Sequence, residues 1–302
     1  MNRRQRQALL YRTVCPDWLN RFPSKILRLL IKTVAFPFIA IKNPVAFSPA
    51  KIALPYIEMP LTVRCTLRCV KCANLMQYYK HCWDMPYEDA LRYIDILLDT
   101  ADKIYQYGLI GGEPFLYPNL AGIVECLCTC GKVEKILILT NGTVVPKDEA
   151  LLCALHNKKV SVRISDYGEK SRRLKEMTAL FDEREICYKV ENMVENWYDF
   201  GNLHVRGRNE EQLSRQFQMC SSTCTSYLNG RLHACPRSGH GMDLGLIPDR
   251  TGDYADLANL IDRKQRRVEV RRFLNQKYIT ACDYCNKGTP DFVKLPMAAE
   301  QQ

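Results

Sequence analysis

The sequence lacks the segments that would carry a chain into or across a membrane. It has 302 residues and begins with the basic stretch MNRRQRQALLYR, after which neither an uninterrupted apolar region nor a small-residue cleavage site follows. Residues 21–42 are partly apolar, but charges interrupt them, and a membrane-spanning helix needs about 20 mostly apolar residues. We therefore predict a cytoplasmic protein.

Other absences narrow the classes of function. The sequence contains no internal repeat, no low-complexity stretch and no basic patch interleaved with aromatic residues, so nucleic acid is not an expected partner. With 47% hydrophobic and 25% charged residues, it has the composition of an ordinary globular protein. Its length suits one large domain or two modest ones.

The net charge of +10 is concentrated near the N-terminus, where residues 1–60 hold ten Lys or Arg and two acidic residues. Four basic residues are spaced as one face of a helix: Arg21, Lys25, Arg28 and Lys32. We predict that residues 1–54 form a basic amphipathic extension. Through residues 21–42 it would either lie on the inner face of an anionic membrane or pack over one end of the catalytic domain.

The cysteine content is high, with fifteen in the chain. In a reducing cytoplasm, clustered cysteines favour metal binding over disulfides. The stretch CTLRCVKC, residues 65–72, holds three cysteines and no fourth, whereas structural zinc and ferredoxin-type clusters take four ligands. Three thiolates on one loop therefore favour an iron–sulfur cluster whose fourth iron stays open to a small molecule. A zinc knuckle or spare thiols are the alternatives.

Strand-like and helix-like stretches alternate after residue 55, which indicates βα units with a parallel sheet, curved into a full or partial barrel. In such sheets the chemistry lies at the carboxyl ends of strands, where the cysteine loop, a GGEP and a TNG also fall. The expected strands are 55–63, 103–111, 135–142, 159–165 and 186–191, and the expected helices are 86–99, 118–130, 147–156 and 170–181.

Near residues 207–218 the pattern gives way to polar residues, which we interpret as the start of a second, smaller unit at 207–302 that follows the barrel unit at 55–206. Asn229-Gly230 between alternating stretches predicts a hairpin. A helix is expected at 262–275. Five cysteines of this unit are candidate metal ligands: Cys220, Cys224, Cys235, Cys282 and Cys285.

CxxxCxxC after the first strand, paired with GGEP after the second, resembles the motifs of the radical S-adenosylmethionine enzymes. The resemblance covers roughly residues 55–206 and implies a partial (β/α)6 barrel. It implies that Cys65, Cys69 and Cys72 hold a [4Fe–4S] cluster. The open iron of that cluster would bind the amino and carboxylate groups of S-adenosylmethionine.

Further contacts to S-adenosylmethionine follow from the same resemblance. The methionine ammonium would be held by the GGEP residues Gly111, Gly112 and Glu113. Ser165 follows the KVSVRI strand, where the family often contacts the ribose or the carboxylate, and Asn141 is a second candidate for that contact. The residue before the third cysteine is usually aromatic in the family, whereas here it is Lys71, which puts the usual adenine contact of this loop in doubt.

The second cysteine group resembles the auxiliary-cluster module of many of these enzymes. No cysteine follows Cys285, so the chain resembles the shortened form of that module, with one auxiliary [4Fe–4S] cluster. Loop spacing favours the ligand set Cys220, Cys235, Cys282 and Cys285. A two-residue turn at Asn229-Gly230 would place Cys224 opposite Cys235, so Cys224 stays an alternate for Cys220. A zinc site from the same residues is the other alternative.

The resemblance implies that a 5′-deoxyadenosyl radical, formed from S-adenosylmethionine, abstracts a hydrogen atom from the substrate. In the shortened-module enzymes a carbinol is oxidised, so we predict an oxidoreductase for a sugar or cyclitol-type small molecule, which would be anionic or carrier-linked. Flavodoxin or ferredoxin would donate the electron. The candidates for the base or a substrate contact lie near the last strand and are His204, Arg206, Tyr198 and Glu191. Arg163 is expected to point into the barrel.

Two other functions remain open. Modification of a peptide or protein is common among enzymes with this module, although residues 1–55 do not look like a peptide-binding domain. A non-catalytic iron–sulfur electron carrier or scaffold is the third hypothesis. The GGEP argues against it, because a carrier has no need to hold S-adenosylmethionine.

Overall fold

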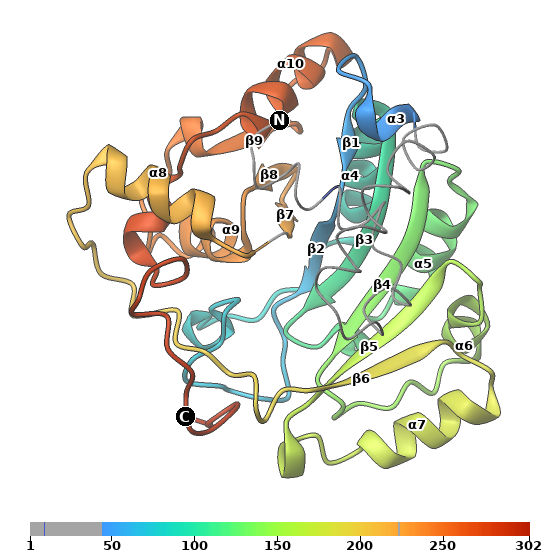
Figure 1. The fold of residues 1–302 in the computed structure, drawn as a ribbon. Coiled ribbons are helices and arrows are strands. Elements are labelled where there is room, and N and C mark those ends of the chain that lie inside the picture. The colour runs from blue at the N-terminus through green and yellow to red at the C-terminus, as the bar shows by residue number, and fades with distance from the viewer. Residues whose placement is uncertain (1–8, 10–43, 223) are drawn as a thin grey trace, which may run out of the picture.

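The computed structural model describes residue 9 and residues 44–222 and 224–302 (Figure 1). The helix expected within residues 21–42 lies outside this part of the chain. The first described element after it is the short helix α3 (Pro44–Phe47). In the described part, no helix is both long and apolar enough to cross a bilayer.

Five strands of the sheet pair in parallel and in chain order, as the alternating pattern predicted. They are β2 (Ile57–Thr62), β3 (Lys103–Gly111), β4 (Val133–Thr140), β5 (Val160–Asp166) and β6 (Tyr188–Asn192). The two-residue strand β1 (Ala53–Leu54) also pairs with β3. This parallel-dominated sheet confirms the predicted partial α/β barrel.

Four helices connect these strands and cover the outer face of the curved sheet (Figure 1). They are α4 (Tyr87–Thr100), α5 (Leu120–Thr129), α6 (Glu149–Leu155) and α7 (Leu174–Glu183). In α4 the buried residues Ala90, Ile94 and Leu97 recur every three or four positions, so one face of the helix packs on the sheet. Because both faces of β2 and β3 are covered, these strands are buried along almost their whole length.

The C-terminal part of the chain extends the same sheet. Strand β7 (Thr225–Leu228) pairs in parallel with β2, and β8 (Arg231–His233) and β9 (Tyr254–Asp256) continue antiparallel. The turn between β7 and β8 consists of Asn229 and Gly230, both at positive φ, which confirms the predicted two-residue hairpin.

Three helices belong to this part of the chain: α8 (Glu210–Met219), α9 (Pro236–Asp243) and α10 (Arg263–Leu274). Helix α9 packs on the hairpin, α10 packs on β9 and α4, and α8 packs on residues 280–284. The sequence predicted α10. It did not predict α8, which lies where the polar stretch was interpreted as a boundary. A capping box of Asn209 and Gln212 starts α8, and Leu213 and Phe217 bury one face of it. A boundary near residue 207 stays a prediction.

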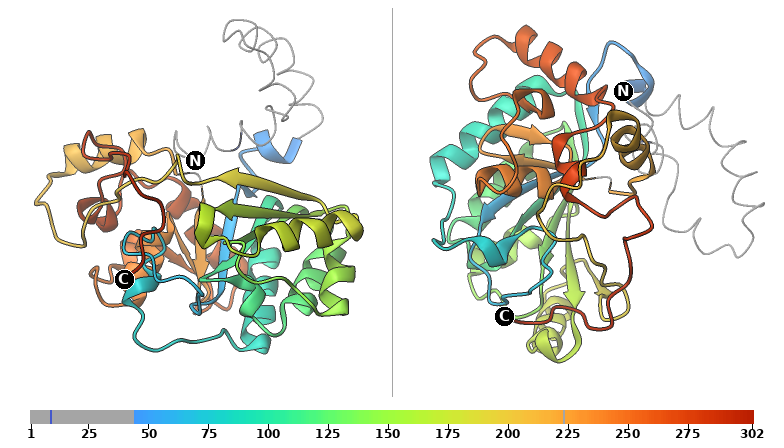
Figure 2. Two further views of the ribbon diagram at one scale, coloured as in Figure 1. Left: turned by 90° about the horizontal axis from the view of Figure 1, so that it is seen from below. Right: turned by 90° about the vertical axis from the view of Figure 1, so that its left-hand side faces the viewer.

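Short 3₁₀ turns occupy several loops: η2 (Met76–Tyr78), η3 (Pro114–Leu116), η4 (Gly168–Lys170), η5 (Thr251–Asp253) and η6 (Thr280–Tyr284). The end of the described chain runs back past the C-terminal helices to the loop after β2, and the views of Figures 1 and 2 agree on this. Segments far apart in the sequence therefore meet at the carboxyl edge of the parallel strands.

Candidate functional site

The loop that carries Cys65, Cys69 and Cys72, which we call the first cysteine set, follows β2 and lies against the GGEP turn after β3. The main-chain N–H of Gly112 donates to the carbonyl of Thr62 at 2.9 Å, and that of Glu113 donates to the carbonyl of Arg64 at 2.8 Å. A Cβ atom on Gly112 would overlap the carbonyl of Arg64. Gly112 is therefore needed for close packing of the two loops.

Each sulfur of the first cysteine set accepts hydrogen bonds from N–H groups. Cys65 Sγ accepts from the main chain of Leu67 at 3.4 Å, and Cys69 Sγ accepts from Gln301 Nε2 at 3.4 Å. The Cys72 sulfur accepts from the main-chain N–H groups of Asn74, Leu75 and Met76. Sulfurs that hold an iron–sulfur cluster carry negative charge, and N–H donors of this kind stabilise it. The three residues therefore fit a cluster.

Burial raises the pKa of Cys65 to about 12 and that of Cys69 to about 11, and it also raises the pKa of Cys72. Thiolates at these positions therefore need a bound cation. Among the described residues, no three His, Cys, Asp or Glu side chains converge as ligands of one metal ion. A four-iron cluster does not require three side chains to meet at one ion, because each thiolate binds a different iron.

Glu113 is fully buried beside this loop. Its carboxylate accepts hydrogen bonds from Thr140 Oγ1 at 2.9 Å, from the main chain of Asn141 at 2.9 Å and from that of Phe115 at 3.2 Å. Burial raises the pKa of Glu113 to about 7. Within the described residues no Lys or Arg forms an ion pair with it, so the ammonium of a ligand would supply the missing positive charge.

The other two predicted S-adenosylmethionine contacts lie at the same edge of the sheet. Asn141 Nδ2 donates to Cys65 Sγ at 3.6 Å and to Thr66 Oγ1 at 3.2 Å, which places it on the cysteine loop. Ser165 lies on β5 and makes a side-chain hydrogen bond with Tyr167, whose ring is close to the first cysteine set. The structure thus brings all the predicted cofactor contacts together.

The Lys71 side chain interacts with a residue that is distant in the sequence. Its ammonium forms an ion pair with Asp199 at 3.2 Å. Aromatic side chains nevertheless reach the loop from elsewhere, because Trp197 and Tyr167 pack against Cys69 and Cys72 with their rings perpendicular and 5.4 Å apart. The sequence analysis missed Trp197, which lies between β6 and α8 in a stretch with no helical or strand period.

In the C-terminal part, Cys220, Cys235, Cys282 and Cys285 lie close together, and we call them the second cysteine set. Burial raises the pKa of Cys282, and the nearby thiols of the other three raise it further. Cys224 lies elsewhere, close to Tyr56 and Arg163.

The path of the chain explains the place of Cys224. The β7–β8 ladder ends at the pair Ser226–His233, and the N–H of Thr225 bonds to the carbonyl of Tyr56 at 3.0 Å. The pairing with β8 thus ends before Thr225, whose bond to the chain next to β2 is still made.

Arginines surround the second cysteine set. Arg208 Nη1 donates to the carbonyls of Cys282 and Cys285 at 3.0 Å each, and Arg206 Nη1 donates to that of Asp283 at 3.1 Å. Arg237 is 5% exposed, and its Nε donates to the carbonyl of Tyr284 at 2.9 Å. In the described part of the chain, none of the three arginines forms an ion pair with a carboxylate.

The candidates for catalysis lie beside this region. His204 and Arg206 line a 450 Å³ cavity together with Lys71 and Asp199. His204 is exposed, and Arg206 also donates to Asn286 Oδ1 at 2.7 Å. Arg163 forms an ion pair with Glu191 on β6 at 3.5 Å and is close to Tyr56 and Glu58 near β2. It therefore points into the barrel, as its alternation predicted.

A second cavity, of 540 Å³, is lined by Cys72 of the first set and by residues that lie near members of the second set in the sequence. The residues near the second set are Ser221 and Lys287. Five aromatic side chains line it: Tyr167, Trp197, Tyr198, Phe200 and Phe292. The rings of Tyr198 and Phe292 stack with their centroids 4.9 Å apart, and the Lys287 ammonium lies 5.4 Å from the ring centre of Phe292.

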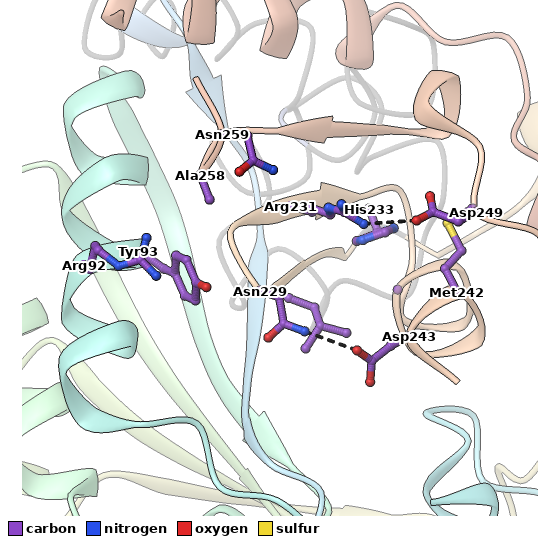
Figure 3. A pocket seen from close by; sticks show the side chains of 12 residues that line it. Arg92, Tyr93, Asn229, Arg231, His233, Met242, Asp243, Asp249, Ala258 and Asn259 are labelled. Atoms are coloured by element: carbon purple, nitrogen blue, oxygen red, sulfur yellow. Dashed lines mark hydrogen bonds and ion pairs between the residues drawn. The ribbon is translucent and has the colours of Figure 1, made fainter. Parts of the chain in front are cut away.

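A third cavity, of 360 Å³, lies between α4 and the β7–β8 hairpin, and no cysteine lines it (Figure 3). Its polar side chains bond to one another. Asn229 donates to Asp243 at 3.2 Å, and Arg231 donates to Asp249 at 3.2 Å. Because this cavity is separate from both cysteine sets, we assign it no part in the chemistry.

Part of the chain is similar to known proteins. Residues 59–200 match the family model of the radical SAM superfamily. The antilisterial bacteriocin subtilosin biosynthesis protein AlbA of Bacillus subtilis (strain 168) is 32% identical over 112 residues, which are 35% of this chain and 22% of AlbA. A GTP 3',8-cyclase of Clostridium perfringens (strain SM101 / Type A) is 25% identical over 148 residues, 47% of this chain and 44% of the cyclase. The matches thus span less than half of these relatives.

Solved structures resemble the chain more distantly. Native anSMEcpe with bound AdoMet and Cp18Cys peptide gives a TM-score of 0.48 at 13% identity, over 77% of this chain and 83% of that one. BtrN in complex with AdoMet and 2-DOIA gives 0.45 at 15% identity, over 82% of this chain and 97% of that one.

Proposed function

Because the chain belongs to the radical SAM superfamily, we propose that it is an oxidoreductase that converts an alcohol of a sugar or cyclitol-type substrate into a ketone. A [4Fe–4S] cluster and S-adenosylmethionine are the cofactors of this superfamily. Here the first cysteine set would hold the cluster, and Gly111, Gly112 and Glu113 would hold the methionine ammonium. When bound, the cofactors supply a hydrogen-abstracting radical, and a second cluster would accept the electron left on the substrate.

The observation that carries the proposal is the 540 Å³ cavity beside Cys72, which Ser221 and Lys287 also line. A substrate there would contact the loop of Cys72 and the chain next to Cys220 and Cys285. The site is suited to a ring with an apolar face and several hydroxyls, because aromatic rings wall the cavity and Asn74, Asn196 and Ser221 offer hydrogen bonds.

The chain's own residues would bind and orient the substrate. The Lys287 ammonium lies over the rings of Phe200 and Phe292 and forms no ion pair within the described residues, so it could receive an anionic group of the substrate. His204 and Arg206 line the adjoining cavity and remain the candidates for the base. A flavodoxin or ferredoxin as electron donor and membrane contact through residues 21–42 also remain predictions.

A second function is favoured by one relative. AlbA, 32% identical over 112 residues, is a bacteriocin biosynthesis protein. A peptide could enter the same aromatic cavity by a side chain. Modification of a peptide is therefore the alternative that the experiment must separate from alcohol oxidation.

The test uses reconstituted, anaerobic protein with S-adenosylmethionine and a chemical reductant. Sugars and cyclitols that carry deuterium at each carbinol carbon are compared with unlabelled peptides. We expect deuterium in 5′-deoxyadenosine and a ketone with one of the alcohols. The matched variant Cys282→Ser/Cys285→Ser should still transfer deuterium but form no ketone. Turnover of peptides alone would overturn the proposal in favour of the alternative.

A further inference from the structure

The loop of the first cysteine set is paired with the far end of the described chain. The N–H of Val70 donates to the carbonyl of Glu300 at 2.8 Å, and the N–H of Gln302 donates to that of Arg68 at 2.9 Å. These bonds form an antiparallel bridge between Cys69 and Gln301. Figures 1 and 2 show the end of the chain beside this loop.

Buried contacts hold this segment in place. Ala298 and Ala299 are 4% and 0% exposed and pack with Cys69 and Trp197. Farther back, the N–H of Leu295 donates to the carbonyl of Trp197 at 2.8 Å. Within the described residues the cysteine loop pairs with none of the strands of the sheet, so the bridge to Gln301 provides its main-chain pairing.

The Gln301 side chain uses both ends of its carboxamide. Oε1 accepts from the main-chain N–H of Arg68 at 2.7 Å, and Nε2 donates to Cys69 Sγ at 3.4 Å. Nε2 also donates to the carbonyl of Ala299, a residue at positive φ that turns the chain back toward the loop. One end thus fixes the loop, and the other reaches the sulfur itself.

We propose that Gln301 is a positioning residue of the first iron–sulfur site, which holds the Cys69 thiolate in place and raises the reduction potential of its cluster. Reduction adds negative charge to a cluster, and an N–H donor to a ligand sulfur stabilises that charge. The cluster of this superfamily must receive an electron before it acts, so a higher reduction potential makes that step easier. The inference rests on the superfamily's own cluster and needs neither alcohol oxidation nor a second cluster.

The test compares Gln301→Glu with Gln302→Glu in the full chain after reconstitution. The first variant keeps an oxygen that can accept from Arg68 but loses the donor to the sulfur. The second adds the same charge one residue away, where only the main-chain N–H of Gln302 contacts the loop. Midpoint potential is measured by an EPR-monitored titration, and iron release is measured with a chelator. The first cluster is recognised because its open iron makes its signal respond to S-adenosylmethionine.

We expect Gln301→Glu to lower the potential and to release iron about 10-fold faster than the native chain, while Gln302→Glu behaves as native. The neutral variant Gln301→Leu separates the hydrogen bond from the charge, and it should also lower the potential. If Gln301→Glu fails to hold iron while the other variants hold it, that result would also support the proposal. Equal potential and equal iron release in Gln301→Leu and the native chain would overturn it.

Discussion

The two cysteine sets are built in opposite ways. The first set lies on eight consecutive residues, 65–72, and faces the buried carboxylate of Glu113. The second set is gathered from a helix end, a hairpin and a 3₁₀ turn, and arginines surround it. One set is thus made by local sequence and the other by tertiary folding.

The neighbouring charges suit different occupants. A carboxylate beside three thiols suits a centre that also receives the ammonium of a small molecule. Arg206, Arg208 and Arg237 beside four thiols suit a closed centre whose thiolates carry a net negative charge. From this difference we propose that the first set binds a ligand and that the second set stays closed.

The largest effect is expected from variants that remove one cysteine set at a time. If each set holds a four-iron cluster, the native chain contains about eight irons, and Cys65→Ala/Cys69→Ala/Cys72→Ala or Cys282→Ala/Cys285→Ala contains about four. Only the first variant should lose cleavage of S-adenosylmethionine. Iron and zinc analysis of anaerobically reconstituted protein checks this. About four irons in the native chain with zinc present would make the second set a zinc site.

The next effect concerns ligand binding at the first set. Glu113→Gln keeps the size of the side chain but removes its charge, so the loss of a charged hydrogen bond of about 1.5–3 kcal/mol should weaken S-adenosylmethionine binding about 10- to 100-fold. Titration calorimetry on the reconstituted protein measures this. The control is Glu134→Gln, an exposed carboxylate on β4 that pairs with Lys103. Equal affinity in both variants would mean that another group holds the ammonium.

A smaller effect is expected from the cation beside the second set. Arg237→Met removes a buried guanidinium that bonds to the carbonyls of Tyr284 and Gly201, and it should cost about 3 kcal/mol of stability. We expect a lower Tm and loss of metal from the second set, with the first set still loaded. Arg250→Met, at an exposed position, is the control. An unchanged metal content would show that Arg237 does not balance the negative charge of the second cysteine set.

The smallest effect tests the hairpin that positions Cys235. Gly230 has a φ of 74°, and a Cβ there would press on Ala258 and the ring of Tyr93. Gly230→Ala should therefore cost about 1–2 kcal/mol in denaturant unfolding. Gly252→Ala, where a Cβ would meet nothing within 4 Å, should be neutral. Equal unfolding midpoints would argue that the turn relaxes freely.

Local pattern explains what the sequence could predict. Alternating βα units place loops at the carboxyl ends of parallel strands, so the meeting of the cysteine loop, Glu113 and Asn141 followed from order along the chain alone. Cys224 stayed an alternate for Cys220, because a regular hairpin would place it opposite Cys235. The ladder between β7 and β8 ends at Ser226 and His233, before that pair, and local sequence does not show where a ladder ends.

The remaining features have no local signal. Helix α8 is amphipathic, but its buried face is small, and its mostly polar sequence suggested a linker. Trp197 and Gln301 reach the first cysteine set from irregular segments, where neither period nor motif marks them. Such residues are placed by hydrogen bonds to other loops, which sequence spacing does not encode.

The pairing of β2 with β7 has a consequence for synthesis. Ile57 and Glu58 are joined by Thr225 and Ser226, so β2 emerges from the ribosome long before its neighbour exists. Until then, one edge of a fully buried strand stays open to other chains, which is a risk for aggregation. This edge closes when translation has passed the hairpin of β7 and β8.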